Sequence, residues 1–145
     1  MRGNQQTDRE YSTCYHPSCK RNVQTDRKDS AELKEAPVRE CRTFAEAETL
    51  VCVLKDARTC VSDGGVHTYM NTSGNDGMAT AGSGDVLAGM IAGLSAGGIS
   101  PTEAARLGVY IHGLAGDRAK KRYGKAAITA GSLIDEIGPI MSSYV

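Results

Sequence analysis

The sequence predicts an α/β fold in which a short sheet is followed by three helices. Residues 50–55 (LVCVLK) form a continuous apolar run rich in β-branched side chains, which is typical of a strand buried on both faces. Residues 71–145 then combine a glycine-rich loop with three helix-forming segments. A strand buried on both faces, followed by helices that can cover it, is the pattern on which the α/β prediction rests.

The sheet is predicted from local signals along residues 38–70. A helix over 38–48 follows Pro37 and leads into the strand at 50–55. A second strand is expected at 59–62, and after the turn signal Asp-Gly-Gly the alternating residues 66–70 predict a return strand. Three strands are too few for a closed, doubly wound domain, so we expect the sheet to be part of a larger one.

Three helices are predicted after the loop. The first spans 85–97 and ends at a glycine pair, and its Gly89 and Gly93 give a smooth face for packing on a sheet. Residues 100–103 (SPTE) supply an N-cap, a proline at the first helical position and a capping-box glutamate for a helix to about residue 123. The last helix is expected over 129–143.

Composition excludes several function classes. Seventeen basic and seventeen acidic residues give no net charge, so no global field draws the chain to nucleic acid or to a membrane surface. Residues 1–10 are polar and do not form a signal peptide, and the longest apolar stretch, 86–99, is too short and glycine-rich to span a bilayer. We therefore expect a soluble, cytoplasmic protein that binds neither nucleic acid nor membranes.

Five cysteines, an odd number on irregular spacing without a secretory context, predict free thiols; they are Cys14, Cys19, Cys41, Cys52 and Cys60. Cys14, His16 and Cys19 suggest a metal site, but a fourth ligand at finger-like spacing is absent. No protein-held metal is predicted.

The main chemical signal is the loop 75–85 (NDGMATAGSGD), which runs into the first helix. Gly77, Gly82 and Gly84 permit positive φ and allow backbone N–H groups to approach a ligand. The helix N-terminus next to them adds unpaired N–H groups and a positive dipole end. Together they predict an anion hole for a transferring phosphoryl group, although the loop is neither a Walker A motif nor a Rossmann fingerprint.

Asp85 at the end of this loop has two interpretations. It accepts the proton of a hydroxyl that attacks phosphorus, or it is an N-cap that satisfies helix N–H groups. Lys55 either contacts phosphate or simply ends its strand. His112 is interpreted as a packed helical histidine, and Asp117, in the middle of a helix, is given no role.

Residues 75–93 closely resemble the signature of the NAD(P)H-hydrate dehydratases, which are members of the ribokinase-like superfamily. The resemblance extends upstream through 53–59 (VLKDART) and downstream through 105–117 (ARLGVYIHGLAGD). It implies the C-terminal half of a ribokinase-like three-layer fold, a partial sheet flanked by helices. Residues 44–145 would be the nucleotide-binding part, and residues 1–43 a divergent polar leader.

The resemblance also implies an activity. The family converts NADHX or NADPHX back to NADH or NADPH: ADP or ATP phosphorylates the hydrate hydroxyl, and the phosphate is then eliminated. Mg²⁺ is the expected companion of the phosphates. Because the family domain is about twice as long, we expect a homo-oligomer that covers the open sheet edge. Alternatives are a nucleotide-binding relic without turnover and a kinase for a small alcohol.

The resemblance assigns residues to this chemistry. Asp85 would be catalytic and would lie at the hydrate hydroxyl. His16, in Tyr15-His16-Pro17, stands where the family has a Thr-Pro-His-Pro segment that contacts the hydrate. The nucleotide would be held by Lys55, Asp56, Ala57, Arg58, Thr59, Asn75, Asp76, Gly77, Met78, Ala79, Thr80, Ala81, Gly82, Ser83 and Gly84.

Overall fold

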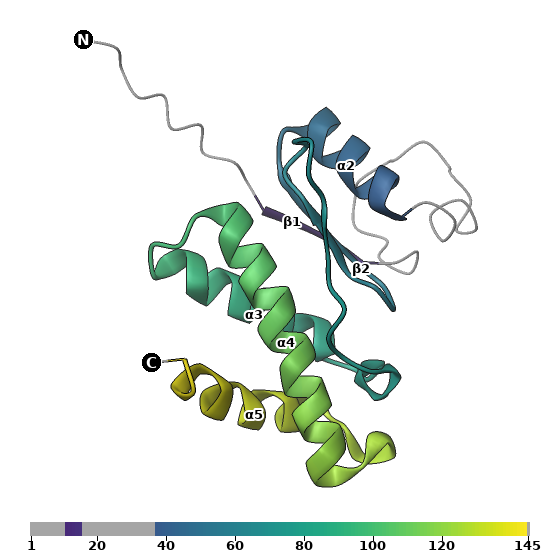
Figure 1. Ribbon diagram of the computed structural model, residues 1–145, viewed down its shortest axis with the longest axis vertical. Coiled ribbons are helices and arrows are strands. Elements are labelled where there is room, and N and C mark those ends of the chain that lie inside the picture. The colour runs from purple at the N-terminus through teal and green to yellow at the C-terminus, as the bar shows by residue number, and fades with distance from the viewer. Residues whose placement is uncertain (1–10, 16–36, 145) are drawn as a thin grey trace.

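The computed structural model describes residues 11–15 and 37–144, and side chains from residue 37 onward. From α2 onward its helices and strands follow the predicted order (Figure 1). They are β1 (Tyr11–Tyr15), α2 (Pro37–Glu48), β2 (Val51–Lys55), β3 (Cys60–Ser62), β4 (Tyr69–Met70), α3 (Ser83–Ala96), α4 (Pro101–Tyr123) and α5 (Ala130–Ser142). Of two short 3-10 helices, η1 (Asp76–Met78) precedes α3 and η2 (Lys125–Ala127) lies between α4 and α5.

The sheet has the strand order β1-β2-β3-β4. β2 pairs in parallel with β1 and antiparallel with β3, so that Val53 lies opposite both Thr13 and Val61. The predicted strand at 50–55 is thus confirmed as a central strand. β1 falls within residues 1–43, where a polar leader and no strand were predicted. The return strand is shorter than predicted, because only Tyr69 and Met70 join the ladder.

Helices cover both faces of the sheet, and the alternation of side chains along β2 explains how. Val51 and Val53 point to one face, where they pack with Leu87 of α3 and Val109 of α4. Cys52 points to the other face and packs with residues of α2. This gives the predicted layers of helix, sheet and helix, with α2 apart from α3 and α4 (Figure 1).

α5 packs on α4 rather than on the sheet, through two small apolar clusters. The pair is also joined by a buried carboxylate: Glu136 of α5 accepts hydrogen bonds from Arg118 at 2.9 Å and Arg122 at 3.2 Å. These two guanidinium groups hold the pKa of Glu136 below its ordinary value. α4 is therefore the common support of the helical layer.

Helix ends agree in part with the predictions. Ser100 is the N-cap of α4, but its side chain makes no capping bond, and Glu103 pairs with Arg106 instead. α3 begins at Ser83, two residues earlier than predicted. Its small-residue face does not pack on the sheet: Gly89 is exposed, and a Cβ there would meet nothing within 4 Å.

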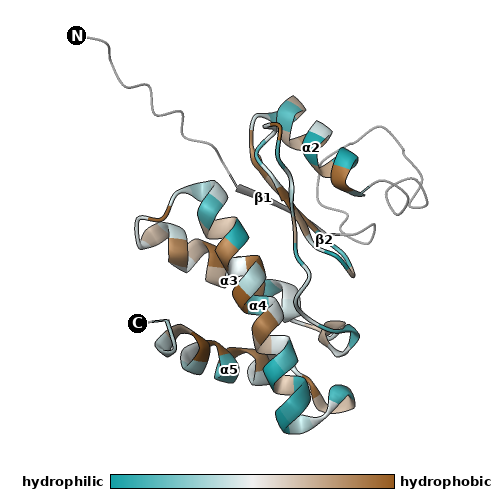
Figure 2. Cartoon of the chain, in the orientation of Figure 1, coloured by the Kyte–Doolittle hydropathy of each residue, from teal (hydrophilic) through white to brown (hydrophobic). Residues whose placement is uncertain are grey.

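Three of the cysteines lie in the described region with their side chains, and all three are buried free thiols: Cys41, Cys52 and Cys60. Burial raises the pKa of Cys60 to about 11, so this thiol stays protonated and packs as an apolar group. Parts of β2, α3, α4 and α5 are brown, and thus apolar, in Figure 2, and these elements supply many of the buried apolar residues. Within the described residues, no helix is long and apolar enough to cross a membrane.

Candidate functional site

The predicted phosphate loop connects β4 to α3 and bends into the helix at Gly82. Gly82 is the N-cap of α3 and has a left-handed backbone, with φ of 80°. It is the only one of the three predicted glycines with positive φ. Gly77 is required for space, because a Cβ there would lie 2.7 Å from the carbonyl oxygen of Lys125. Gly84 lies inside the first turn of α3, so neither Gly77 nor Gly84 uses the positive φ that a glycine permits.

The first turn of α3 leaves backbone donors available. Ser83 donates its N–H to Thr80 and Val86 donates to Gly82. Among the described residues, the N–H groups of Gly84 and Asp85 have no hydrogen-bond acceptor. Two free donors at the positive end of a helix, next to a left-handed glycine, form a geometry that suits an anion.

Asp85 is exposed at the third position of α3, beside these donors. The N-cap is Gly82, so the interpretation of Asp85 as an N-cap is wrong. A carboxylate in the first turn interacts favourably with the helix dipole, which gives it a modest structural role. Its exposure also leaves the carboxylate available to a ligand bound at the helix end.

His112 of α4 is hydrogen-bonded to the first turn of α3. Its Nε2 donates to the carbonyl oxygen of Ser83 at 2.9 Å and lies 3.4 Å from the Ser83 hydroxyl oxygen. Burial lowers the pKa of His112 to about 4, opposed by the Ser83 hydrogen bond and assisted by the charge of Lys55. The imidazole is thus a neutral donor at neutral pH, as expected of a packed histidine.

The second predicted segment, 55–59, is linked to the start of the loop by a hydrogen bond at Thr59, and its Lys55 affects His112 through its charge. Lys55, at the end of β2, acts electrostatically on His112 beneath Ser83. Thr59 accepts a hydrogen bond from the N–H of Asn71 at 2.8 Å, where the loop begins. The residues between them form an exposed turn, in which Asp56 accepts from the N–H of Ala57. In the described chain, no hydrogen bond joins this turn to residues 75–85.

The structure adds a residue to the site that sequence reasoning dismissed. The Asp117 carboxylate of α4 accepts from the N–H of Gly74 at 2.9 Å and from the side-chain amide of Asn75 at 3.1 Å. Giving Asp117 no role was therefore wrong. The earlier reasoning considered only the backbone of its own helix, whereas its partners lie more than forty residues away in sequence.

The other predicted loop residues lie on the surface. Asp76 forms an ion pair with Lys125 of η2, which lowers the pKa of Asp76. Ala79 and Ala81 are exposed and Thr80 is half-buried. Met78 is half-buried and packs against the cluster that joins α4 and α5. His16 lies outside the described residues.

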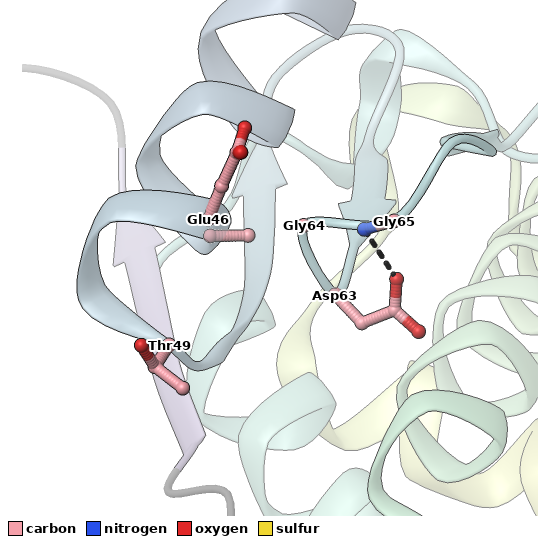
Figure 3. A pocket seen from close by; sticks show the side chains of 6 residues that line it. Glu46, Thr49, Asp63, Gly64 and Gly65 are labelled. Carbon is pink, nitrogen blue, oxygen red and sulfur yellow. Dashed lines mark hydrogen bonds between the residues drawn. The ribbon is translucent and has the colours of Figure 1, made fainter.

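A shallow hollow of about 280 Å³ lies elsewhere, between the end of α2 and the turn after β3 (Figure 3). Glu46, Thr49 and Asp63 line it, and Asp63 accepts a hydrogen bond from the N–H of Gly65. Asp63 also accepts from the Thr102 hydroxyl at the start of α4. These contacts hold a turn in place, and none of the predicted site residues lines the hollow.

Within the described residues, no group of three or more His, Cys, Asp or Glu side chains could hold a metal ion.

Comparisons with known proteins agree on one family. The sequence profile described as NAD(P)H-hydrate dehydratase matches residues 25–139. A bifunctional NAD(P)H-hydrate repair enzyme from Moorella thermoacetica is 45% identical over 106 residues, which cover 73% of this chain and 20% of that protein.

Two solved structures are also similar. An ADP/ATP-dependent NAD(P)H-hydrate dehydratase from Bacillus subtilis, co-crystallized with ATP/Mg²⁺, has a TM-score of 0.76 and 25% identity, covering 80% of this chain and 42% of that chain. A ribokinase-like superfamily protein from Enterococcus faecalis has a TM-score of 0.70 and 28% identity, covering 92% and 44%. The predicted ribokinase-like fold is confirmed, and the chain spans less than half the length of each of these relatives.

Proposed function

Because the chain belongs to the NAD(P)H-hydrate dehydratase family, we propose that it is the nucleotide-binding part of an enzyme that converts NADHX or NADPHX back to NADH or NADPH. Residues 44–145 supply this part. Residues 1–43 are the proposed divergent lead-in, although the family match already begins at residue 25 and β1 joins the sheet. The observation on which the proposal depends is the pair of free N–H groups of Gly84 and Asp85 at the start of α3.

ADP or ATP is the proposed cosubstrate, with Mg²⁺ on its phosphates. The Bacillus relative is named as ADP/ATP-dependent, and the site of this chain suits a phosphate. The free donors of Gly84 and Asp85 directly follow Gly82, the left-handed N-cap of α3. Lys55 adds a positive charge on the side of His112 and Ser83. Segments 55–59 and 75–84 are the proposed nucleotide contacts.

The nucleotide, once bound, supplies the phosphoryl group that makes the hydrate hydroxyl a leaving group. The N–H groups of Gly84 and Asp85 stabilise negative charge on phosphoryl oxygens. The Asp85 carboxylate, exposed beside them, accepts the proton of the hydrate hydroxyl and orients it. His112 remains neutral and keeps the Ser83 turn in position. His16 is retained as a proposed contact to the hydrate.

We also propose that the chain forms a homo-oligomer. The chain spans 42% of the Bacillus chain. Apolar side chains on α5 are exposed, with Ile134 57% and Met141 40% accessible. A second copy of the chain would cover such surface without any other partner.

The test is recovery of NADPH from purified NADPHX, followed by nicotinamide absorbance, with ADP, ATP or no nucleotide. The proposal expects recovery only with nucleotide, accompanied by release of inorganic phosphate. Nucleotide binding without recovery would support a binding relic instead. Transfer of phosphate to a small alcohol, with NADPHX left unchanged, would support the kinase alternative.

A further inference from the structure

We propose that Asp117 is the positioning residue of the nucleotide loop, an inference that rests on the proposed function. Its two carboxylate oxygens accept from two consecutive residues of the loop, Gly74 and Asn75. Asp117 itself does not lie among residues 75–85. Its effect on a bound nucleotide would therefore act through the loop.

A relay of hydrogen bonds extends from Asp117 into the loop. The Asn75 amide nitrogen donates to Asp117, and the amide oxygen of the same side chain accepts the N–H of Gly77 at 3.1 Å. Asn75 is the N-cap of η1, so this second bond sets where η1 begins. Asp117 therefore orients the side chain that determines the backbone course of residues 75–78.

The surface of α4 around Asp117 is shaped to let the loop approach closely. A Cβ at Gly113 would lie 2.1 Å from the Ser73 hydroxyl oxygen and 2.9 Å from the Ser73 carbonyl carbon. A Cβ at Gly116 would lie 2.0 Å from the Met78 sulfur. Gly113, Gly116 and Asp117 share one face of α4, because residues three and four apart are neighbours on a helix. The two glycines allow the loop to contact α4 closely, and the two hydrogen bonds of Asp117 fix the position of Gly74 and Asn75 on that helix.

A carboxylate suits this position for a chemical reason. An ionised aspartate offers acceptor sites on both oxygens, whereas asparagine offers an acceptor on one atom and donors on the other. Asp117→Asn would place an amide group against either the Gly74 N–H or the Asn75 amide. One of the two bonds would then be replaced by two facing donors, while the size of the side chain stays the same.

The test compares the wild-type chain with Asp117→Asn and a matched control, Asp135→Asn, which changes an exposed aspartate on α5. ADP affinity is measured by calorimetry, and amide hydrogen exchange by NMR. We expect Asp117→Asn to weaken ADP binding by up to about tenfold, because ordering the loop on binding would then lack the free energy of one hydrogen bond to a charged group. The Gly74 N–H should exchange faster, while amide exchange in α5 stays unchanged. The control should match the wild type.

A purely structural role would give a different pattern: a lower melting temperature, with the ADP affinity of the folded protein unchanged. That result would overturn the inference. A wild-type chain that binds no ADP at all would overturn the proposed function and this inference with it. If Asp117→Asn does not fold, amide exchange in the wild-type chain still tests the inference. The Gly74 N–H should then exchange slowly even without ADP. Rapid exchange at Gly74 would refute the positioning role.

Discussion

Acid should destabilise the chain through His112 before most of its carboxylates titrate. His112 is 5% exposed, and its Nε2 donates to the Ser83 carbonyl oxygen. Burial is the main reason that its pKa falls from 6.5 to about 4. In the unfolded chain the imidazole regains its ordinary pKa. The two states therefore bind different numbers of protons at mildly acidic pH.

The sign and the size of the change in folding stability with pH follow from this difference in bound protons. Between pH 6.5 and about 4, the unfolded chain binds a proton that the folded chain does not, so stability falls as the pH falls. Each tenfold difference in proton affinity is worth about 1.4 kcal/mol. From pH 7 to pH 5 the unfolded imidazole becomes almost fully charged while the folded one stays neutral, a loss of about 2 kcal/mol.

Urea unfolding at pH 7 and pH 5 measures this loss. His112→Gln keeps an amide donor toward Ser83 but does not titrate. The stability of this variant should therefore lack the part of the pH dependence that comes from His112. The wild type should lose about 2 kcal/mol more than this variant over the interval. His67→Gln, at an exposed position, should behave like the wild type. Equal pH dependence in the wild type and His112→Gln would refute the reasoning.

Three other outcomes are expected. Asp85→Asn should lower turnover by roughly 10²–10⁴, the contribution of a positioned base, with little change in ADP affinity; full activity would contradict the proposed role of Asp85. Gly82→Val should weaken ADP binding and cost at least about 1–2 kcal/mol of stability, because its φ of 80° is left-handed; Gly89→Ala, in an open helical position, is the control and should not destabilise. Sedimentation should find a homo-oligomer, and a stable monomer would count against that proposal.

Elements with strong local signals could be predicted from the sequence. The apolar run at 50–55 became β2, because both faces of a central strand are buried here by helices. Pro101 and Thr129 marked the starts of α4 and α5 within one residue. The loop at 75–85 could be identified because its glycines and the following helix are contiguous. In each case the deciding interactions lie close together in the chain.

Features that depend on distant partners could not be predicted. Asp117 seemed without function because its hydrogen-bond donors, Gly74 and Asn75, lie on a loop that only the fold brings to α4. β1 is polar in sequence and forms through pairing with β2 rather than through its own pattern. The start of α3 shifted to Ser83 because Gly82 takes the left-handed N-cap position, so Asp85 falls inside the helix.

The geometry separates two requirements of the proposed reaction. Phosphate binding needs only a contiguous element, Gly82 with the free N–H groups that follow it, supported by His112. Dehydration needs more, because an attacking hydroxyl competes with water unless the site is closed. Asp85 and the neighbouring Ala81 are exposed in the described chain, so this part alone does not exclude water from the phosphate. The proposed reaction therefore requires a closing wall that is not formed by the described residues around Asp85. ADP binding and NADPH recovery therefore report on different parts of the molecule.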